Sequence, residues 1–392
     1  MTNPESIQVF RDKERDVEKR IIAAVGRVGP RNIAELSRLT KVHQETIRYK
    51  FKQRFRRLGF RFHAEVDYRK LGLTPYWMNF SLSPSHYGTA PELFRLLNRS
   101  AYLNYFAKVM PKGNYIARIA TPAGKSDDYT TLLKWMNTQG ILTSFTIREA
   151  SVSRHVSMNP DFFNFRSRRW EIPWDEVEKT PSRPIPVTRR AGSTPVDYHD
   201  LLILKELQKD STQHLTSIAR NVKVNQKTLE YHYRTHIVKE KLVQFYFVRW
   251  AQDTSKTLAH SVALTRLVFH NLSDASLRSV QTTISKIPFL WMEDLMDDRT
   301  YVASLYVPLG DMLSLFGYVN SELGELGSAV DVEYVKTNQA SSFTIPYEMW
   351  EDREWKFKVH DMKSAIMKEY PFLGAKKKRF PRLGGETTAN LV

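Results

Sequence analysis

The chain of 392 residues carries 59 Lys and Arg against 42 Asp and Glu, a net charge of +17, with 42% hydrophobic and 12% aromatic residues. This length suits several domains with buried cores, and the positive charge favours a polyanionic partner such as nucleic acid. The absence of cysteine excludes disulfides, thiolate metal sites and cysteine nucleophiles.

Residues 1–70 predict a first winged helix-turn-helix domain. Apolar residues recur at helical spacing over 14–25 and 33–39, and a turn follows at 40–43. A third helix would pack through side chains spaced four, four and three residues apart, Ile47, Phe51, Phe55 and Leu58. Residues 60–66 alternate like a strand and would form the wing. These 70 residues hold 18 Lys and Arg against 9 Asp and Glu, which suits a DNA-binding module.

Residues 71–168 predict a ferredoxin-like domain of the β-α-β-β-α-β type. Its strands are expected at 77–82, 102–109, 115–120 and 142–150, and its helices at 90–98 and 126–136. The proline-containing segment 169–196 has little apolar content and is interpreted as a semi-extended linker.

The same sequence unit then occurs a second time. The pattern Lys-Val-x-Gln-x-Thr-x-x-Tyr occurs from Lys41 to Tyr49 and again from Lys223 to Tyr231. Residues 197–255 therefore predict a second winged helix-turn-helix, and 256–358 a second ferredoxin-like domain with strands at 261–268, 289–295, 301–307 and 330–335 and helices at 274–285 and 309–321. Residues 359–392 are interpreted as a basic C-terminal tail. The predicted fold class is α+β, with two winged helix-turn-helix domains alternating with two ferredoxin-like domains.

The third helix of a helix-turn-helix is the one that reads DNA, through cations for phosphates and amides or hydroxyls for base edges. On this basis the predicted DNA-binding residues are Gln44, Arg48, Tyr49, Lys50, Lys52, Gln53, Arg56, Gln226, Lys227, Tyr231 and Arg234. The second unit is less basic, with 9 Lys and Arg against 6 acids over 197–250. The first helix is therefore expected to dominate affinity. Packing or a solvated basic face remains the alternative for each helix.

This organisation resembles the Lrp/AsnC family of transcription regulators, whose sensor half is the ferredoxin-like RAM domain. The resemblance is carried by Ile-Ala-Glu-Leu-Ser at 33–37, Thr-Ile at 46–47, Phe-His-Ala-Glu-Val-Asp at 62–67 and Lys-Leu-Gly at 70–72. Matching stretches recur at 201–210, 215–219 and 228–229. It implies a sequence-specific DNA-binding regulator, with double-stranded DNA as partner and self-association through the RAM-type domains, as an internal pseudo-dimer or a homodimer. The turns at 112–115 and 297–300 depart from the family's Gly-Asp turn, so a small-molecule effector is left open.

Enzyme signatures are sparse, because the sequence contains no GxGxxG, P-loop, HExxH or GxSxG pattern. The prediction is therefore a non-enzyme without cofactor, metal or membrane partner, located in the cytoplasm at the nucleoid. His232 and His236 lie four residues apart and could bind a metal, although two ordinary histidines are the favoured interpretation. A non-specific DNA-architectural protein is one alternative function.

A second alternative is an enzyme similar to the sirohaem decarboxylases, which resemble Lrp/AsnC proteins in fold. Such an enzyme needs a pocket bearing His and Arg for a porphyrin carboxylate. Arg154 and His155 are of the right types, but the sequence favours a surface pair just past the last sensor strand.

Overall fold

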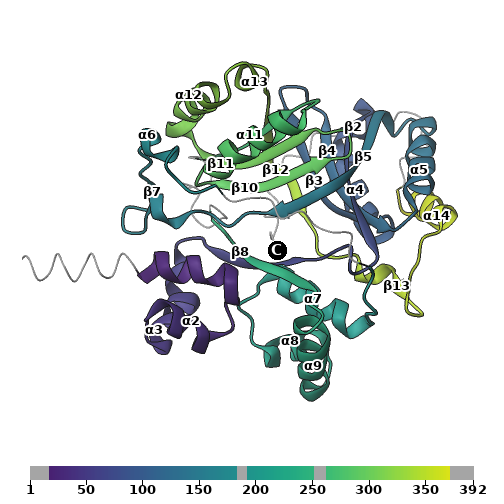
Figure 1. Cartoon of the computed structure of the whole chain (residues 1–392). Coiled ribbons are helices and arrows are strands. Elements are labelled where there is room, and N and C mark those ends of the chain that lie inside the picture. The colour runs from purple at the N-terminus through teal and green to yellow at the C-terminus, as the bar shows by residue number, and fades with distance from the viewer. Residues whose placement is uncertain (1–16, 183–191, 251–261, 371–392) are drawn as a thin grey trace, which may run out of the picture.

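The computed structural model describes residues 17–182, 192–250 and 262–370, and has a mixed α+β fold. Two helix-turn-helix units alternate along the chain with two ferredoxin-like units, as the sequence predicts. In Figure 1 the two helix-turn-helix units lie side by side below a large sheet, whose helices cover its outer faces. No helix in the described part of the chain combines the length and the apolar character needed to cross a membrane.

The first helix-turn-helix unit consists of a helix over residues 17–28, α2 (Ile33–Thr40) and α3 (Gln44–Tyr49), which continues as a π-helical segment (Lys50–Phe55). Asn32 starts α2 by accepting the backbone N–H of Glu35 at 3.2 Å. The predicted apolar face of the third helix is buried, Ile47, Phe51, Phe55 and Leu58.

The second unit repeats this arrangement with α7 (Tyr198–Lys209), α8 (Leu215–Val222), α9 (Gln226–His232) and a π-helical segment (Tyr233–Val238). Lys41 and Lys223 end the middle helices in the same left-handed conformation, with φ +57° in both. Each third helix then begins with a side-chain cap, from His43 in one unit and Asn225 in the other. The duplicated motif therefore folds twice into the same local structure.

Both ferredoxin-like units have the predicted order of elements. The first contains β2 (Leu73–Leu82), α4 (Ala90–Ser100), β3 (Leu103–Met110), β4 (Tyr115–Pro122), α5 (Ser126–Thr138) and β5 (Leu142–His155). The second contains β9 (Val262–Phe269), α11 (Asp274–Ser285), β10 (Leu290–Met296), β11 (Tyr301–Pro308), α12 (Met312–Leu323), α13 (Glu325–Ser328) and β12 (Asp331–Ser342). The last strand of each unit, β5 or β12, extends beyond its predicted end.

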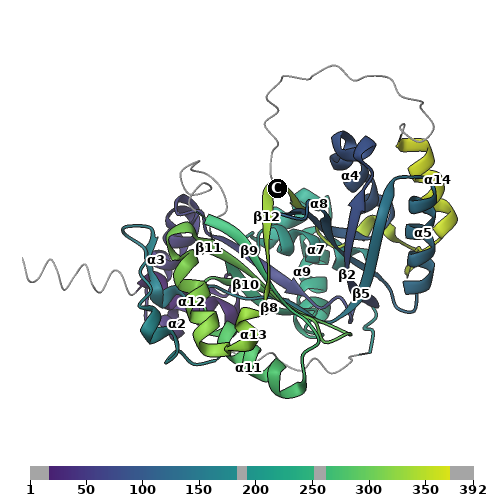
Figure 2. The ribbon, with the colours of Figure 1, turned by 90° about the horizontal axis from the view of Figure 1, so that it is seen from above.

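These extensions join the two four-stranded sheets. Strand β5 pairs with β10, and β12 pairs with β3, so that the eight strands close into a barrel in the order β10-β11-β9-β12-β3-β4-β2-β5. Figure 2 shows the helices of the two units at opposite sides of this closed sheet. Both halves of the duplicated chain therefore contribute strands to one sheet.

The strands predicted as wings are present, but they pair with each other across the two helix-turn-helix units. Strand β1 (Arg61–Val66) pairs antiparallel with β8 (Val243–Arg249), so each helix-turn-helix unit gives one strand to a shared ribbon. The second helix-turn-helix unit contributes β8 alone to this ribbon. The ribbon lies between the helix-turn-helix units and the closed sheet (Figure 1).

The segment predicted as a linker is partly structured. Its first residues form β7 (Arg169–Trp170), which pairs with β6 (Phe163–Asn164) just before the segment, and then α6 (Trp174–Val177), which packs on the second ferredoxin-like unit. There Trp174 Nε1 donates to Asp311 Oδ1 at 3.2 Å. Residues 183–191 of the predicted linker lie outside the described residues.

The second half of the chain has a matching hairpin and helix, which pack on the first ferredoxin-like unit. A hairpin of β13 (Trp350–Glu351) and β14 (Glu354–Trp355) packs on the first ferredoxin-like unit, where Trp355 Nε1 donates to the carbonyl of Leu71 at 2.6 Å. Helix α14 (Val359–Glu369) then packs on α4 and α5. The segment predicted as a tail from residue 359 thus begins with a packed helix, and residues 371–392 lie outside the described part.

Candidate active site

A cavity of about 770 Å³ lies between the β1–β8 ribbon and the closed sheet. It is lined by both strands of the ribbon, by α7, by strands from both ferredoxin-like units, and by residues 337–348, which form the end of β12 and the segment that follows it. Its volume falls within the range of about 300–1,000 Å³ that is usual for small-molecule sites. Because both halves contribute to its walls, the cavity exists only in the assembled chain.

One face of the ribbon supplies four ionisable side chains to this cavity. Side chains two residues apart point to the same face of a strand, so Arg61, His63 and Glu65 share one face of β1. In the antiparallel register Arg61 lies opposite Arg249, and His63 lies opposite Phe247. All five line the cavity. The other face of β1 carries buried Phe62, Ala64 and Val66.

Two imidazoles stack with the ring of Phe247. The His155 ring is 4.3 Å from it at an interplanar angle of 2°, and the His63 ring is 5.4 Å from it at 27°. His63 is on β1 and His155 is the last residue of β5, so the ribbon and the barrel each provide one histidine.

His63 is held in its neutral form. Its Nδ1 donates to the carbonyl of Gln208 at 2.7 Å, and a carbonyl can only accept, so Nε2 carries the lone pair. Burial, helped by the nearby charge of Arg249, lowers the pKa of His63 from 6.5 to about 3. At neutral pH this imidazole can accept a hydrogen bond through Nε2.

His155 is oriented by a buried carboxylate. Its Nδ1 lies 2.6 Å from Glu65 Oε2, and the Glu65 side chain is 5% exposed. Burial alone raises the pKa of Glu65, but His155 and Arg118 outweigh it and leave this pKa below its usual value of 4.5. The pair therefore contains an ionised carboxylate that fixes the ring of His155 through Nδ1. The other ring nitrogen, Nε2, is not used in this contact.

Three guanidinium groups line the cavity. Arg118, on β4, is 7% exposed and lies 5.7 Å from the ring of Tyr68. Arg249 donates to Tyr306 Oη at 2.9 Å and lies over the ring of Trp291. Arg61 is half-buried and lies opposite Arg249 in the ribbon. Guanidinium groups bind carboxylates in a bidentate manner, so the cavity suits an anionic ligand.

Several buried polar atoms on the cavity wall lack a hydrogen-bond partner within the described structure. They are His63 Nε2, Arg118 Nε, Trp291 Nε1 and both side-chain polar atoms of Asn104. Unsatisfied buried polar groups are rare and costly in native proteins. A polar ligand in the cavity could form hydrogen bonds with these atoms.

The sequence-based prediction for Arg154 and His155 requires correction. Strand β5 continues through both residues and pairs with β10, so they do not lie on the surface beyond the strand. The two side chains then diverge. His155 lines the cavity, whereas Arg154 Nη2 pairs at 2.7 Å with Glu293, whose side chain is fully buried. The alternation Arg-x-His-x-Glu from Arg61 to Glu65 was a signal for the remaining residues, but it was assigned to a wing.

The residues predicted to bind DNA lie on the two third helices, away from this cavity. The exposed members are Arg48, Tyr49, Lys52, Gln53, Arg56, Gln226, Lys227, Tyr231 and Arg234, and Gln44 is half-buried. Among them Arg48 pairs with Glu45, and Arg56 pairs with Asp210 at 3.2 Å. Their role in DNA binding stays an untested prediction.

Lys50 does not face solvent as a phosphate contact would. It is 6% exposed, and its Nζ lies 2.7 Å from Glu18 on the first helix. It follows Ile47 by three residues, which places it on the inward side of the helix. Lys50 is therefore a structural ion-pair partner in this fold.

The fold and the cavity together define a duplicated helix-turn-helix and ferredoxin-like protein, of the Lrp/AsnC architecture, with a cavity lined by three arginines and two histidines. No protein-family profile and no curated protein sequence matches the chain. Among solved structures, the crystal structure of the siroheme decarboxylase NirDL is similar over 90% of this chain and 98% of its own, with a TM-score of 0.53 and 10% sequence identity.

The crystal structure of NirDL in complex with an iron-uroporphyrin III analogue matches in the same way. It covers 88% of this chain and 98% of that one, with a TM-score of 0.52 and 10% identity. At this level of identity the likeness shows a shared fold over nearly the whole of both chains.

These comparisons correct the main functional prediction. The Lrp/AsnC-type architecture is confirmed, but the interpretation as a transcription regulator that is not an enzyme is contradicted, because two structures that are similar over 88–90% of the chain are those of an enzyme. The error has a physical basis: one fold supports different functions, and the helix-turn-helix pattern reports only the fold.

Proposed function

We propose that this chain is an enzyme that decarboxylates a tetrapyrrole bearing carboxylate side chains. The observation that carries the proposal is the cavity in which two imidazoles and three guanidinium groups from both halves of the chain converge. The fold shared with the siroheme decarboxylase NirDL supports the choice of reaction and substrate class.

The walls of the cavity suit a flat, anionic substrate. Tyr105, Trp291 and Tyr306 offer aromatic surface from three barrel strands, β3, β10 and β11. Such rings bind a macrocycle by stacking and by burial of its apolar faces. Arg61, Arg118 and Arg249 then hold its carboxylates. In this arrangement the aromatic contacts position the macrocycle, and the arginines determine which of its carboxylates is held.

The reaction requires a proton donor. Decarboxylation breaks the bond between the carboxylate carbon and its neighbour, releases CO₂ and leaves an electron pair on the neighbouring carbon, which then takes up a proton. His155 is our candidate donor through Nε2, with Glu65 fixing its ring from Nδ1. His63 is neutral and accepts through Nε2, so it binds a donor group of the substrate rather than supplying the proton.

The test is binding and turnover with sirohaem and with iron uroporphyrin III. Titration followed in the Soret band measures binding, and mass spectrometry detects products that have lost CO₂. We expect Arg118→Gln to weaken binding by about 10- to 150-fold, the loss of one hydrogen bond to a charged group. We expect His155→Gln to lower the rate about 10²- to 10⁴-fold with little change in binding.

Matched controls are available on the surface. Arg95→Gln removes an exposed arginine of α4 that pairs with Glu92, and His214→Gln removes an exposed histidine before α8. Both should leave binding and turnover unchanged. Absence of tetrapyrrole binding by the folded chain, or turnover unaffected by both cavity variants, would show that the proposal is wrong.

A further inference from the structure

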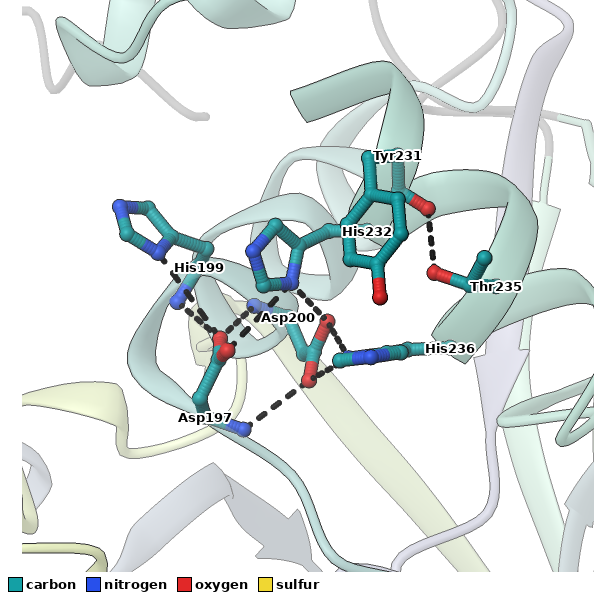
Figure 3. Close-up of polar contacts among 7 residues, drawn as sticks. All are labelled: Asp197, His199, Asp200, Tyr231, His232, Thr235 and His236. Atoms are coloured by element: carbon teal, nitrogen blue, oxygen red, sulfur yellow. Dashed lines mark hydrogen bonds and ion pairs between the residues drawn. The ribbon is translucent and has the colours of Figure 1, made fainter. Parts of the chain in front are cut away.

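A second cluster of ionisable side chains lies in the second helix-turn-helix unit, apart from the residues that line the cavity. Asp197, Asp200, His232 and His236 each bring one ligand-type atom to a position within 4.8 Å of the others. Asp197 caps α7 and Asp200 is in its first turn, whereas His232 ends α9 and His236 is in the π-helical segment. Figure 3 shows the four side chains directed toward one another.

The contacts between the side chains of the cluster join a histidine Nδ1 to a carboxylate oxygen. His236 Nδ1 lies 2.9 Å from Asp200 Oδ2, and His232 Nδ1 lies 3.1 Å from Asp200 Oδ1 and 3.4 Å from Asp197 Oδ2 (Figure 3). A tetrahedral zinc ion with bonds of 2.0–2.2 Å separates its ligand atoms by about 3.4 Å. The spacing of the four donors therefore suits a single tetrahedral ion after small side-chain shifts.

The backbone holds the two carboxylates in place. Asp197 Oδ1 accepts the N–H groups of His199 at 2.8 Å and Asp200 at 3.1 Å, and Asp200 Oδ2 accepts the N–H of Asp197 at 2.9 Å. These bonds form a reciprocal cap at the start of α7. Outer hydrogen bonds of this kind orient the ligands of metal sites.

In the first helix-turn-helix unit, the matching position holds a buried carboxylate with two cationic partners. Alignment of the two copies of the motif places Glu18 opposite Asp200, Lys50 opposite His232 and Arg54 opposite His236. Glu18 has a side chain that is 4% exposed, and it pairs with Lys50 at 2.7 Å and with Arg54 at 3.4 Å. In the first unit, two permanent cations thus surround one buried carboxylate.

The second unit has no permanent cation at the matching positions. Lys50 and Arg54 are replaced by imidazoles, and Asp197 adds a second carboxylate next to Asp200, whose side chain is fully buried. The cluster therefore lacks the permanent positive charges that Lys50 and Arg54 place around Glu18, and a buried carboxylate without a counterion is unfavourable. A divalent cation would supply both positive charges that Lys50 and Arg54 provide in the first unit.

We propose that Asp197, Asp200, His232 and His236 form a structural site for a divalent transition-metal ion of the zinc class. Neutral imidazole nitrogens and carboxylate oxygens together suit zinc, and four protein ligands are typical of a structural site without an open position. The ion joins the first turn of α7 to the end of α9 and the π-helical segment. It replaces, in the second unit, the ion pairs that join the same helices in the first.

The test uses the untagged, full-length chain, stripped with a chelator and titrated with ZnCl₂ in competition with a chromophoric chelator. We expect one tight zinc ion per chain. Cobalt(II) in its place should give the visible absorption of tetrahedral coordination. The test variant is His232→Lys with His236→Arg, which copies the first unit and supplies its own cations. It should fold, melt independently of zinc and bind zinc at least about 100-fold more weakly, since even loss of an outer partner costs about 10- to 100-fold.

Two further variants keep the test decisive. His214→Gln, which removes an exposed histidine of the same unit, should leave zinc affinity and stoichiometry unchanged. If the double variant does not fold, Asp197→Asn alone removes a ligand charge at a partly exposed position and should still weaken zinc binding and abolish the cobalt spectrum. Zinc binding no tighter in the wild-type chain than in the folded variants would overturn the proposal.

Discussion

The pair formed by Glu65 and His155 gives the sharpest prediction about the cavity. Glu65→Gln keeps the shape of the side chain but removes its charge, and so converts a charge-assisted hydrogen bond of 2.6 Å into a neutral one. Hydrogen bonds to charged groups contribute about 1.5–3 kcal/mol. If the bond is fully used in the transition state, its loss slows turnover by about 10- to 150-fold.

The effect should fall on kcat rather than KM. Glu65 acts through His155, so it is a positioning residue, and removal of an interaction that matters only in the transition state lowers kcat and kcat/KM together. The assay is single-turnover decarboxylation at neutral pH, followed by mass spectrometry. Glu149→Gln is the matched control, because Glu149 is on the same strand as His155 but pairs with Arg69 at 3.1 Å.

The pH dependence provides an independent readout of the same pair. Because the pKa of Glu65 in the folded chain is below 4.5, its stabilising contribution is complete above pH 4.5 and is lost as pH falls through the folded-state pKa. Glu65→Gln should lack this loss of stability in acid. A folded Glu65→Gln enzyme with unchanged kcat, or with a change in KM alone, would refute the role assigned to Glu65.

Two further predictions concern stability. The pKa of His63 is lowered from 6.5 to about 3, so between these pH values the unfolded chain binds a proton that the folded chain does not. The free energy of unfolding should therefore decrease as pH falls through this window. In thermal melts His63→Gln should flatten this pH dependence, and the control His214→Gln should not. Gly29 has φ +75°, and a Cβ there would lie 2.6 Å from the Tyr246 ring of the other half. Gly29→Ala should therefore lower the free energy of unfolding by about 1–3 kcal/mol, measured by denaturant unfolding. The control is Gly88→Ala, where a Cβ meets nothing within 4 Å. Equal unfolding midpoints for the two variants would contradict this packing.

The sequence by itself determined the local elements and their order. Helical spacing located the buried face of the third helix in the first unit, as at Ile47 and Phe55, and both ferredoxin-like units have the predicted sequence of strands and helices. These features depend on periodicity and capping within short stretches, and the internal duplication reinforced each assignment in the second copy.

The ion pairs beneath the third helices were accessible in principle but were missed. Lys50 lies one turn from Ile47 on the helical wheel, so its inward direction follows from spacing alone. The need for a partner such as Glu18 could have been inferred from that burial, because a buried lysine requires a counterion. The basic composition of the helix favoured a phosphate contact instead.

Only the tertiary structure decided where the cavity is and what lines it. Strand alternation shows that Arg61, His63 and Glu65 share a face, but not what that face meets, because strand partners distant in sequence leave no local periodicity. The pairing of β1 with β8 brings Phe247 and Arg249 to this face, and the extension of β5 along β10 adds His155. The charged pocket is a product of long-range pairing, and for that reason a sequence that predicted the fold well predicted the wrong function.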